Sequence, residues 1–368
     1  MNHANIDEKR KREFIRKTIQ KFSLNLEGLV VFTEAATGNY KHIPIIAALA
    51  GAKQVFAVTT DSRYGKKEDI KNLVLNDAKE LGVDKKITIL FDKNKDCLRK
   101  SDIVTNLGFV RPITKDMISC MKPTAVIPLM WETWEFRAEE LDLKACRERG
   151  IIVLGTNEHH PLLDLFRSNG FLICKLLFNK GFDVYKDNLL LIASGHIGDS
   201  AADFFINAGI SFNRIVFDDK IPEHQRAFVY SREEILNNLD AYDAIIIAEL
   251  HHNMDILSLN GFIPVRLLKE KNPLIQIIHI CGSVNKNDIE HEVLSIYPEN
   301  IMPFGYMTVS PDYLGPKTLL ELNTAGLKVG EVMARCRLKR LSIKDTIEYT
   351  IKNSPAMDFE GGFLRYER

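Results

Sequence analysis

Residues 188–209, NLLLIASGHIGDSAADFFINAG, have the pattern of a buried strand, a glycine-containing turn and a helix. A dinucleotide-binding turn lets the backbone approach a diphosphate and aims the N-terminus of a helix at it. Compared with the GxGxxG fingerprint, an alanine replaces the first glycine, while Gly195 and Gly198 keep the other two. The residues predicted to bind a cofactor at this turn are Ala193, Ser194, Gly195, His196, Ile197 and Gly198.

The run RIVFDD, residues 214–219, places acidic residues where the fingerprint expects one, about 20 residues after the turn. A carboxylate at this position hydrogen-bonds the ribose hydroxyls and repels a 2′-phosphate, so Asp218 and Asp219 favour NAD over NADP. The alternative is a plain turn between strand and helix, in which the glycines serve packing and an aspartate caps the next element.

Short apolar runs alternate with helical patterns along most of the chain. GLVVFT, QVFAVTT, KITILF, DIVTNLG, TAVIPLM and GIIVLGT form a first set, and NLLLIAS, RIVFDD, DAIIIAEL and LIQIIHICG form a second. Such alternation is typical of parallel sheets wound in βαβ units. The sequence therefore predicts an α/β protein with two doubly wound parallel-sheet domains, the second a Rossmann dinucleotide-binding domain.

The domain boundaries follow from two helical patterns. One, at residues 162–182, separates the two sets of strands, and the other, at residues 313–338, follows the second set. We expect the second pattern to cross back, which gives a discontinuous substrate domain of residues 1–160 plus 311–368 and an NAD-binding domain of residues 161–310. Ligands of such folds bind at the carboxyl ends of the strands, so the active site is expected in the cleft between the domains.

The composition narrows the class of partner. Among 368 residues, Lys plus Arg and Asp plus Glu are equal at 49 each, so no net field favours nucleic acid or an anionic membrane. The six cysteines show neither a CxxC pair nor a zinc-like spacing, which favours reduced thiols and no metal. No segment reads as a secretory leader or a membrane span. We expect a cytoplasmic protein that acts on a small molecule.

Polar residues that follow the strands of the first set are candidate substrate ligands. They are Glu34, Thr37, Arg111, Trp131, Glu132 and Arg137. A guanidinium matches a carboxylate with two hydrogen bonds, so the arginines could clamp an anionic substrate. The alternatives are a helix entry at Thr37 and a domain interface around the tryptophan, because tryptophan and arginine are enriched at interfaces.

Two histidine pairs also follow predicted strands, in GTNEHHP and AELHHN. Histidine has a pKa near neutral pH without assistance, so it suits general acid or base catalysis. His252 and His160 are the preferred acid–base candidates, with Tyr306 as a third. The residues expected around the nicotinamide are Glu249, Leu250, His251, Cys281 and Gly282. Each histidine could instead be structural, and Cys281 an inert buried thiol.

The order of these parts resembles the D-isomer-specific 2-hydroxyacid dehydrogenases. The similar segments are PITKDMISCMKPTAVI at residues 112–127, LDLKACRERGIIVLGTNEHHP at residues 141–161 and the glycine turn at residues 189–209. The resemblance implies a split substrate domain, NAD, hydride transfer to or from a substrate carbonyl carbon, and a homodimer. The expected substrate is a small, polar hydroxy or oxo acid.

The chain departs from that family at two functional positions. Cys281 stands before Gly282 where members carry an arginine, and Phe304 follows Pro303 where members carry a catalytic histidine. Three functions therefore remain open: a divergent NAD-dependent dehydrogenase, an enzyme that retains NAD and uses it transiently as adenosylhomocysteine hydrolases do, and a catalytically inactive NAD-binding regulatory protein. The polar residues after the strands favour the first.

Overall fold

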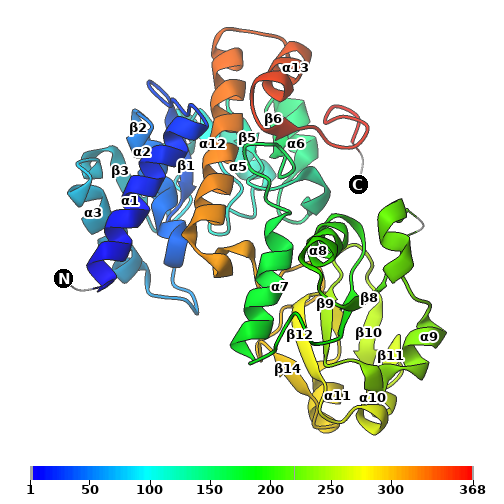
Figure 1. The fold of residues 1–368 in the computed structure, drawn as a ribbon. Coiled ribbons are helices and arrows are strands. Elements are labelled where there is room, and N and C mark those ends of the chain that lie inside the picture. The colour runs from blue at the N-terminus through cyan, green and yellow to red at the C-terminus, as the bar shows by residue number, and fades with distance from the viewer. Residues whose placement is uncertain (1–2, 219, 367–368) are drawn as a thin grey trace. The chain divides into compact units, whose positions relative to one another are not determined.

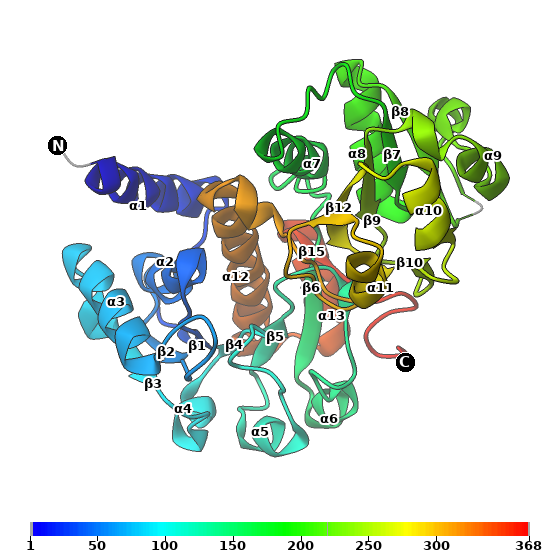
Figure 2. The same cartoon turned by 90° about the horizontal axis from the view of Figure 1, so that it is seen from below.

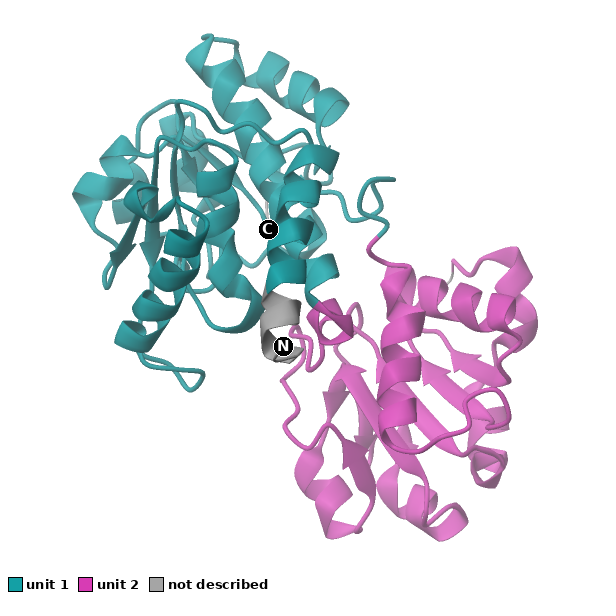
Figure 3. Cartoon of the chain, turned by 60° about the vertical axis from the view of Figure 1, so that its left-hand side comes forward, with its two compact units in different colours: residues 1–164, 316–368 teal, residues 165–315 magenta. Residues whose placement is uncertain are grey.

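The computed structural model describes residues 3–218 and 220–366. The chain forms two compact units, shown in separate colours in Figure 3: unit 1, residues 1–164 and 316–368, and unit 2, residues 165–315. Each unit is built around a parallel sheet (Figure 1). The predicted fold class, an α/β protein with two parallel-sheet units, is confirmed.

The described part of unit 1 contains a seven-stranded sheet with the order β15-β6-β5-β4-β1-β2-β3. Its strands are β1 (Val30–Glu34), β2 (Gln54–Val58), β3 (Ile87–Leu90), β4 (Ile103–Val104), β5 (Val126–Pro128), β6 (Ile152–Thr156) and β15 (Ala356–Met357). Only β15 is antiparallel to its neighbour. From β1 the chain winds outward through β2 and β3 and then returns to the other side of β1 as β4. The carboxyl ends of β1 and β4 therefore form a topological switch point, the position where ligands bind in open α/β sheets.

Helices cover both faces of this sheet (Figure 2). The helices of unit 1 are α1 (His3–Lys21), α2 (Ile43–Leu49), α3 (Lys67–Glu80), α4 (Lys95–Lys100), α5 (Lys115–Cys120), α6 (Leu143–Arg149), α12 (Pro316–Leu338) and α13 (Ile343–Asn353). α2 and α12 pack on one face, and α4, α5 and α6 lie on the other. The strands are buried on both sides, which explains why they read as continuous apolar runs rather than as alternating ones.

Unit 2 contains a five-stranded parallel sheet with the order β14-β12-β9-β7-β8. Its strands are β7 (Leu189–Ile192), β8 (Phe212–Ile215), β9 (Ala244–Ala248), β12 (Gln276–Cys281) and β14 (Ser295–Tyr297). Because β8 and β9 flank β7 on opposite sides, the switch point of this unit lies at the carboxyl ends of β7 and β9. All five residues of β9, AIIIA, are buried.

In the part of the chain that is described, the remaining elements of unit 2 are five α-helices, three short 3₁₀ helices and a small sheet. The α-helices are α7 (Ser168–Asn179), α8 (Gly195–Ala208), α9 (Arg232–Asn237), α10 (Val265–Lys271) and α11 (Lys286–His291). The small sheet joins β10 (Asp255–Ser258) with β11 (Ile263–Pro264) and β13 (Ser283–Val284). The apolar pattern did not predict this small sheet, because its strands are only two to four residues long.

Two elements have other bounds than the sequence predicts. The helix predicted at residues 162–182 is α7, Ser168–Asn179, and the prediction was wrong at both ends. The residues before it form turns with Asp164 at φ +46°, and Gly181 at φ +83° ends the helical conformation. The strand predicted from RIVFDD ends at Ile215, because the backbone N–H of Phe217 bonds the hydroxyl of Ser194 instead of a neighbouring strand.

Candidate functional site

The turn after β7 brings Ser194 and Gly195 to the switch point of unit 2. Ser194 is the N-cap residue of α8, and its hydroxyl accepts the N–H of Phe217 at 2.9 Å. Gly195, the first residue of the helix, has φ +57°, a conformation that residues other than glycine rarely adopt. Ala193 and Ile197 are buried in the core below the turn. The predicted fingerprint therefore forms a strand, a tight turn and a helix N-terminus.

Asp218 lies directly against this turn. Its Oδ2 accepts the backbone N–H of Gly195 at 3.0 Å, and its Oδ1 lies 3.3 Å from Nε2 of His252. A free N–H in the first turn of a helix is a favoured position for an anion, and here the carboxylate occupies it. Asp219, the second predicted ribose ligand, lies outside the described residues.

Glu249 organises the loop after β9. Its side chain is fully buried, and its Oε1 accepts the backbone N–H groups of His251 and His252, both at 2.9 Å. Nδ1 of His252 lies 3.2 Å from the same oxygen. Within the described residues, Oε2 of Glu249 is buried without a hydrogen-bond partner. His252 is therefore held between two carboxylates, while Leu250 is a half-buried residue of the same loop.

The imidazole of His251 lies over Gly195. A Cβ added to Gly195 would overlap Nε2 of that ring, so any larger residue would have to displace the imidazole. Partial burial lowers the pKa of His251, although the carboxylates of Glu249 and Asp218 act in the opposite direction. The ring of His196, on the first turn of α8, has its centroid 6.4 Å from that of His251. Two imidazoles, those of His196 and His251, therefore lie beside the turn.

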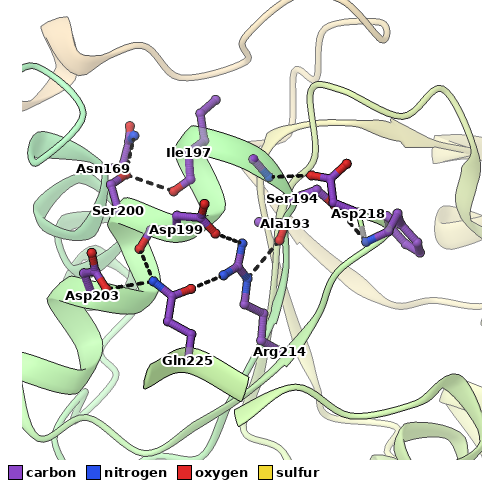
Figure 4. A network of polar contacts seen from close by, with 12 residues as sticks. Asn169, Ala193, Ser194, Ile197, Asp199, Ser200, Asp203, Arg214, Asp218 and Gln225 are labelled. Carbon is purple, nitrogen blue, oxygen red and sulfur yellow. Dashed lines mark hydrogen bonds and ion pairs between the residues drawn. The ribbon is translucent and has the colours of Figure 1, made fainter. Parts of the chain in front are cut away.

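Gly198 lies where α8 packs closely on the chain that follows β7, because a Cβ there would overlap the backbone carbonyl of Ala193. A Cβ at this position would overlap Nη2 of Arg214, which reaches under α8 from β8. Arg214 is fully buried; its Nε donates to the carbonyl of Ala193 at 3.0 Å, and its Nη2 lies 2.9 Å from Oδ1 of Asp199 (Figure 4). Its Nη1 also donates to the side chain of Gln225. Gly198 thus leaves room for a buried guanidinium network, which the sequence did not reveal because an arginine within a strand gives no signal of its own.

Two small residues and a buried histidine lie at the carboxyl end of β12. Cys281 is fully buried, and Gly282 has φ +124°. His279, also buried, is hydrogen-bonded through Nδ1 to the Thr308 hydroxyl at 2.9 Å and through Nε2 to the Gly282 carbonyl at 3.1 Å. Burial lowers the pKa of His279, which favours the neutral ring, although its hydrogen bond to Gly282 acts in the opposite direction. The inert state considered for the Cys281 thiol agrees with its burial.

In unit 1, Glu34 lies at the switch point between β1 and β4. It is the last residue of β1, is 4% exposed, and its Oε2 accepts the N–H of Phe109 at 2.9 Å. Burial raises the pKa of Glu34 to about 7, although the Phe109 N–H and the charge of Arg111 both lower it. Thr37 precedes a short 3₁₀ helix, and its hydroxyl makes no capping hydrogen bond there. Glu34 is thus the predicted substrate ligand with the most altered acidity.

The predicted arginine clamp is paired within unit 1. Arg111 and Arg137 both form ion pairs with Glu140, and the guanidinium of Arg111 lies 4.8 Å from the ring centroid of Trp131. Glu132 is buried; its carboxylate accepts the indole N–H of Trp134 at 2.7 Å and the backbone N–H of Glu158 at 2.9 Å. These side chains form a bonded cluster rather than a set of free ligands.

Two neighbouring carboxyl groups were not predicted from the sequence. Burial raises the pKa of Glu135 to about 7 and raises that of Glu158 well above its usual range, with Glu132 adding like charge to both. Glu135 alternates with aromatic residues in WETWEFR and Glu158 lies in the polar run TNEHH, and neither pattern predicts a buried carboxyl group.

The three acid–base candidates belong to different parts of the fold. His160 lies in unit 1, where its Nδ1 accepts the N–H of Leu162 at 3.2 Å and burial lowers its pKa. Tyr306 lies in the loop after β14, with 39% of its surface exposed. His252 is the one of the three that the structure brings to the Gly195 turn. No group of three or more side chains of the metal-binding types is arranged to hold a metal ion among the described residues.

Comparisons with known proteins bear on the fold. No protein-family model and no curated protein matches the chain. The crystal structure of a dipicolinate synthase polypeptide from Bacillus halodurans aligns with a TM-score of 0.51 and 13% identity, over 86% of this chain and 98% of that chain. The corresponding dipicolinate synthase polypeptide from Bacillus subtilis gives a TM-score of 0.52 and 11% identity, over 88% and 99%.

A D-lactate dehydrogenase with NAD+ from Lactobacillus jensenii aligns at a TM-score of 0.44 with 13% identity, over 76% of this chain and 96% of that chain. At such identities, the two dipicolinate synthase structures show that this chain shares their fold.

No helix in the described part of the chain has the length and apolar character needed to cross a bilayer.

Proposed function

We propose that unit 2 binds NAD at the Gly195 turn and that the chain is an NAD-dependent oxidoreductase of a small hydroxy or oxo acid. One observation carries this proposal: the N–H of Gly195, at a switch point and at the start of a 14-residue helix, already holds an anion, the carboxylate of Asp218. Helix N-termini at such positions bind the diphosphate of dinucleotides.

The residues at the turn fit a dinucleotide after two local changes. Asp218 follows the second strand of the unit, the position from which a carboxylate bonds the ribose hydroxyls. Its hydrogen bond to Gly195 would pass to a phosphate oxygen when it turns to the ribose. The ring of His251 would rotate away from Gly195, and this is feasible because the residue lies on an exposed part of its loop.

A bound nicotinamide would supply hydride transfer between its ring and a carbon that bears a hydroxyl or carbonyl oxygen, and the hydroxyl proton would pass to or from a protein base. His252 suits the base. Its Nε2 faces Asp218, and that nitrogen becomes available once Asp218 turns to the ribose. Its Nδ1 stays 3.2 Å from the buried carboxylate of Glu249, which orients the ring.

Within unit 1, Glu34 is the predicted ligand best suited to bind an oxygen of a small acid. Because its pKa is raised to about 7, a large fraction of Glu34 is protonated at neutral pH and able to donate a hydrogen bond to a carbonyl or carboxylate oxygen. His160 and Tyr306 remain the alternative proton carriers. The substitutions His252→Gln, His160→Gln and Tyr306→Phe test the three candidates, because each removes the group that would carry the proton.

The test is a calorimetric titration of NAD and NADP into the full chain. We expect NAD to bind more tightly, and we expect reduced-nicotinamide absorbance to appear when hydroxy acids are added with NAD. Gly195→Ala should weaken binding, because its Cβ enters the space of the turn. Gly209→Ala is the matched control: Gly209 ends the same helix at φ +68°, and a Cβ there has nothing within 4 Å.

Three results separate the possible functions. Equal loss of binding in Gly195→Ala and Gly209→Ala, or no NAD binding at all, overturns the site. NAD that stays with the protein through gel filtration favours the retained-cofactor enzyme. Binding without turnover on any substrate tested favours the regulatory protein.

A further inference from the structure

Unit 2 has an open hollow of about 390 Å³ beside its small sheet. It is lined by Asp255, Ser283, Val284, Asn285, Lys286 and Asn287. A volume of this size falls within the range of small-molecule sites. Nearly all of the lining side chains are polar, and none of them belongs to the cofactor site described above.

The hollow lies at the same edge of the sheet as the Gly195 turn. Asp255 begins β10, which follows the histidine loop after β9, and it pairs with Ser283, which begins β13 directly after Gly282 at the end of β12. β9 and β12 are adjacent parallel strands, so their carboxyl ends open toward one edge. Ligands of parallel α/β sheets bind at this edge.

The hollow carries one charge of each sign, and both are accessible. Nζ of Lys286 lies 3.2 Å from Glu290 one helical turn away, with the side chains 35% and 58% exposed. Solvated pairs of this kind are weak, so a ligand carboxylate can replace Glu290. Oδ2 of Asp255 accepts the hydroxyl of Ser258, and within the described residues its Oδ1 has no partner.

The amides of the hollow add uncharged donors. The side-chain oxygen of Asn285 accepts the N–H of Asp288 at 3.2 Å, which leaves its NH₂ group to donate. In unit 1, by contrast, both arginines predicted to clamp a carboxylate pair with Glu140. Lys286 is therefore the better candidate for the anionic group of a substrate.

We propose that this hollow binds a small zwitterion of the hydroxy amino acid class, with Lys286 holding its carboxylate and Asp255 holding its ammonium group. That this ligand is the substrate rests on the proposed function; the binding itself does not. Lys286 and Asp255 carry opposite charges in one small hollow, which matches a ligand that carries both charges. A ligand with only one charge would leave one of these two side chains without a partner.

The experiment titrates the full chain with serine and threonine by calorimetry, with and without saturating NAD. The probes for each half of the zwitterion are 3-hydroxypropionate, which lacks the amine, and ethanolamine, which lacks the carboxylate. We expect each half-molecule to bind about tenfold or more weakly than the amino acid, because each loses a charged hydrogen bond. Lys286→Met and Asp255→Asn should each weaken binding of the amino acid about tenfold for the same reason.

Lys344→Met is the matched control, because Lys344 also pairs with a glutamate four residues on, Glu348, but lies in unit 1. Urea unfolding of each variant checks that it is folded. The proposal is overturned if neither amino acid binds under either condition, if 3-hydroxypropionate or ethanolamine binds as tightly as the amino acids, or if binding survives both substitutions in the hollow. Amino acid binding in a protein that fails to bind NAD supports the hollow while overturning the proposed oxidoreductase.

Discussion

The backbone N–H of Gly195 donates a hydrogen bond to Oδ2 of Asp218, 3.0 Å away. The two residues are 23 positions apart in the chain and meet because β7 and β8 are adjacent strands. The bond satisfies a helix N–H that would otherwise face solvent. In the proposed function, a diphosphate and the Asp218 carboxylate would compete for this one donor, so the turn would exchange one anion for another when a dinucleotide binds.

Substitution of Asp218 should change the preference between NAD and NADP. Asp218→Asn keeps an oxygen acceptor but removes the charge that repels a 2′-phosphate, so NADP should bind more tightly than it does to the native protein. Asp218→Ala should weaken NAD about tenfold or more, because a hydrogen bond to a charged group is lost. Calorimetric affinities for both cofactors measure this, and an unchanged ratio in both variants would show that Asp218 does not bind the ribose.

Removal of the His251 ring should strengthen cofactor binding. The ring lies over Gly195, so part of the binding free energy is used to displace it, and His251→Ala should improve NAD affinity about three- to tenfold. His224→Ala is the control, because His224 pairs with Asp203 at 2.6 Å and not with the turn. Weaker binding to His251→Ala would show instead that the imidazole contacts the cofactor.

Glu34 should make the stability of the protein depend on pH. Its pKa is about 7 in the folded state and has the ordinary value of 4.5 in the unfolded state, so between these pH values the folded state holds a proton that the unfolded state has lost. The free energy of unfolding therefore falls as pH rises from 4.5 to about 7.

Glu34→Gln removes this loss and should be about 2–3 kcal/mol more stable than the native protein at pH 8, with little difference at pH 4.5. Urea unfolding between these pH values measures it, and Glu139→Gln, at an exposed position, is the control. The pKa values of Glu135 and Glu158 are also raised, so the free energy of unfolding of Glu34→Gln should still fall somewhat as pH rises. A difference that does not grow with pH would contradict the raised pKa of Glu34.

Gly198 and Arg214 should be energetically coupled. Gly198→Ala adds a methyl group that overlaps both the guanidinium and the Ala193 carbonyl, so it should cost about 1–3 kcal/mol of unfolding free energy. Arg214→Met removes the guanidinium, so Gly198→Ala should lower the unfolding free energy by less in that background. The part of the loss that comes from the overlap with the Ala193 carbonyl should remain. Additive costs in a double-mutant cycle would show that Gly198 does not serve the arginine.

The local pattern of the sequence determined the element types and much of the turn. Runs such as DAIIIAEL predict buried strands because parallel strands covered on both faces need apolar side chains at every position. The spacing of Gly195, Gly198 and Asp218 predicted a turn, a close packing point and an acid beyond the next strand. These features depend on neighbours close in sequence, so propensity and spacing are sufficient to find them.

The tertiary structure decided what those residues contact. Asp218, Gly195 and His252 meet only because β8 and β9 flank β7, and strand order depends on which side each crossover returns to, which no local pattern records. The buried Arg214 beneath Gly198 and the raised pKa of Glu34 likewise arise from packing between distant segments. Burial and charge pairing are properties of the assembled core, so acidity and partner choice had to be read from the fold.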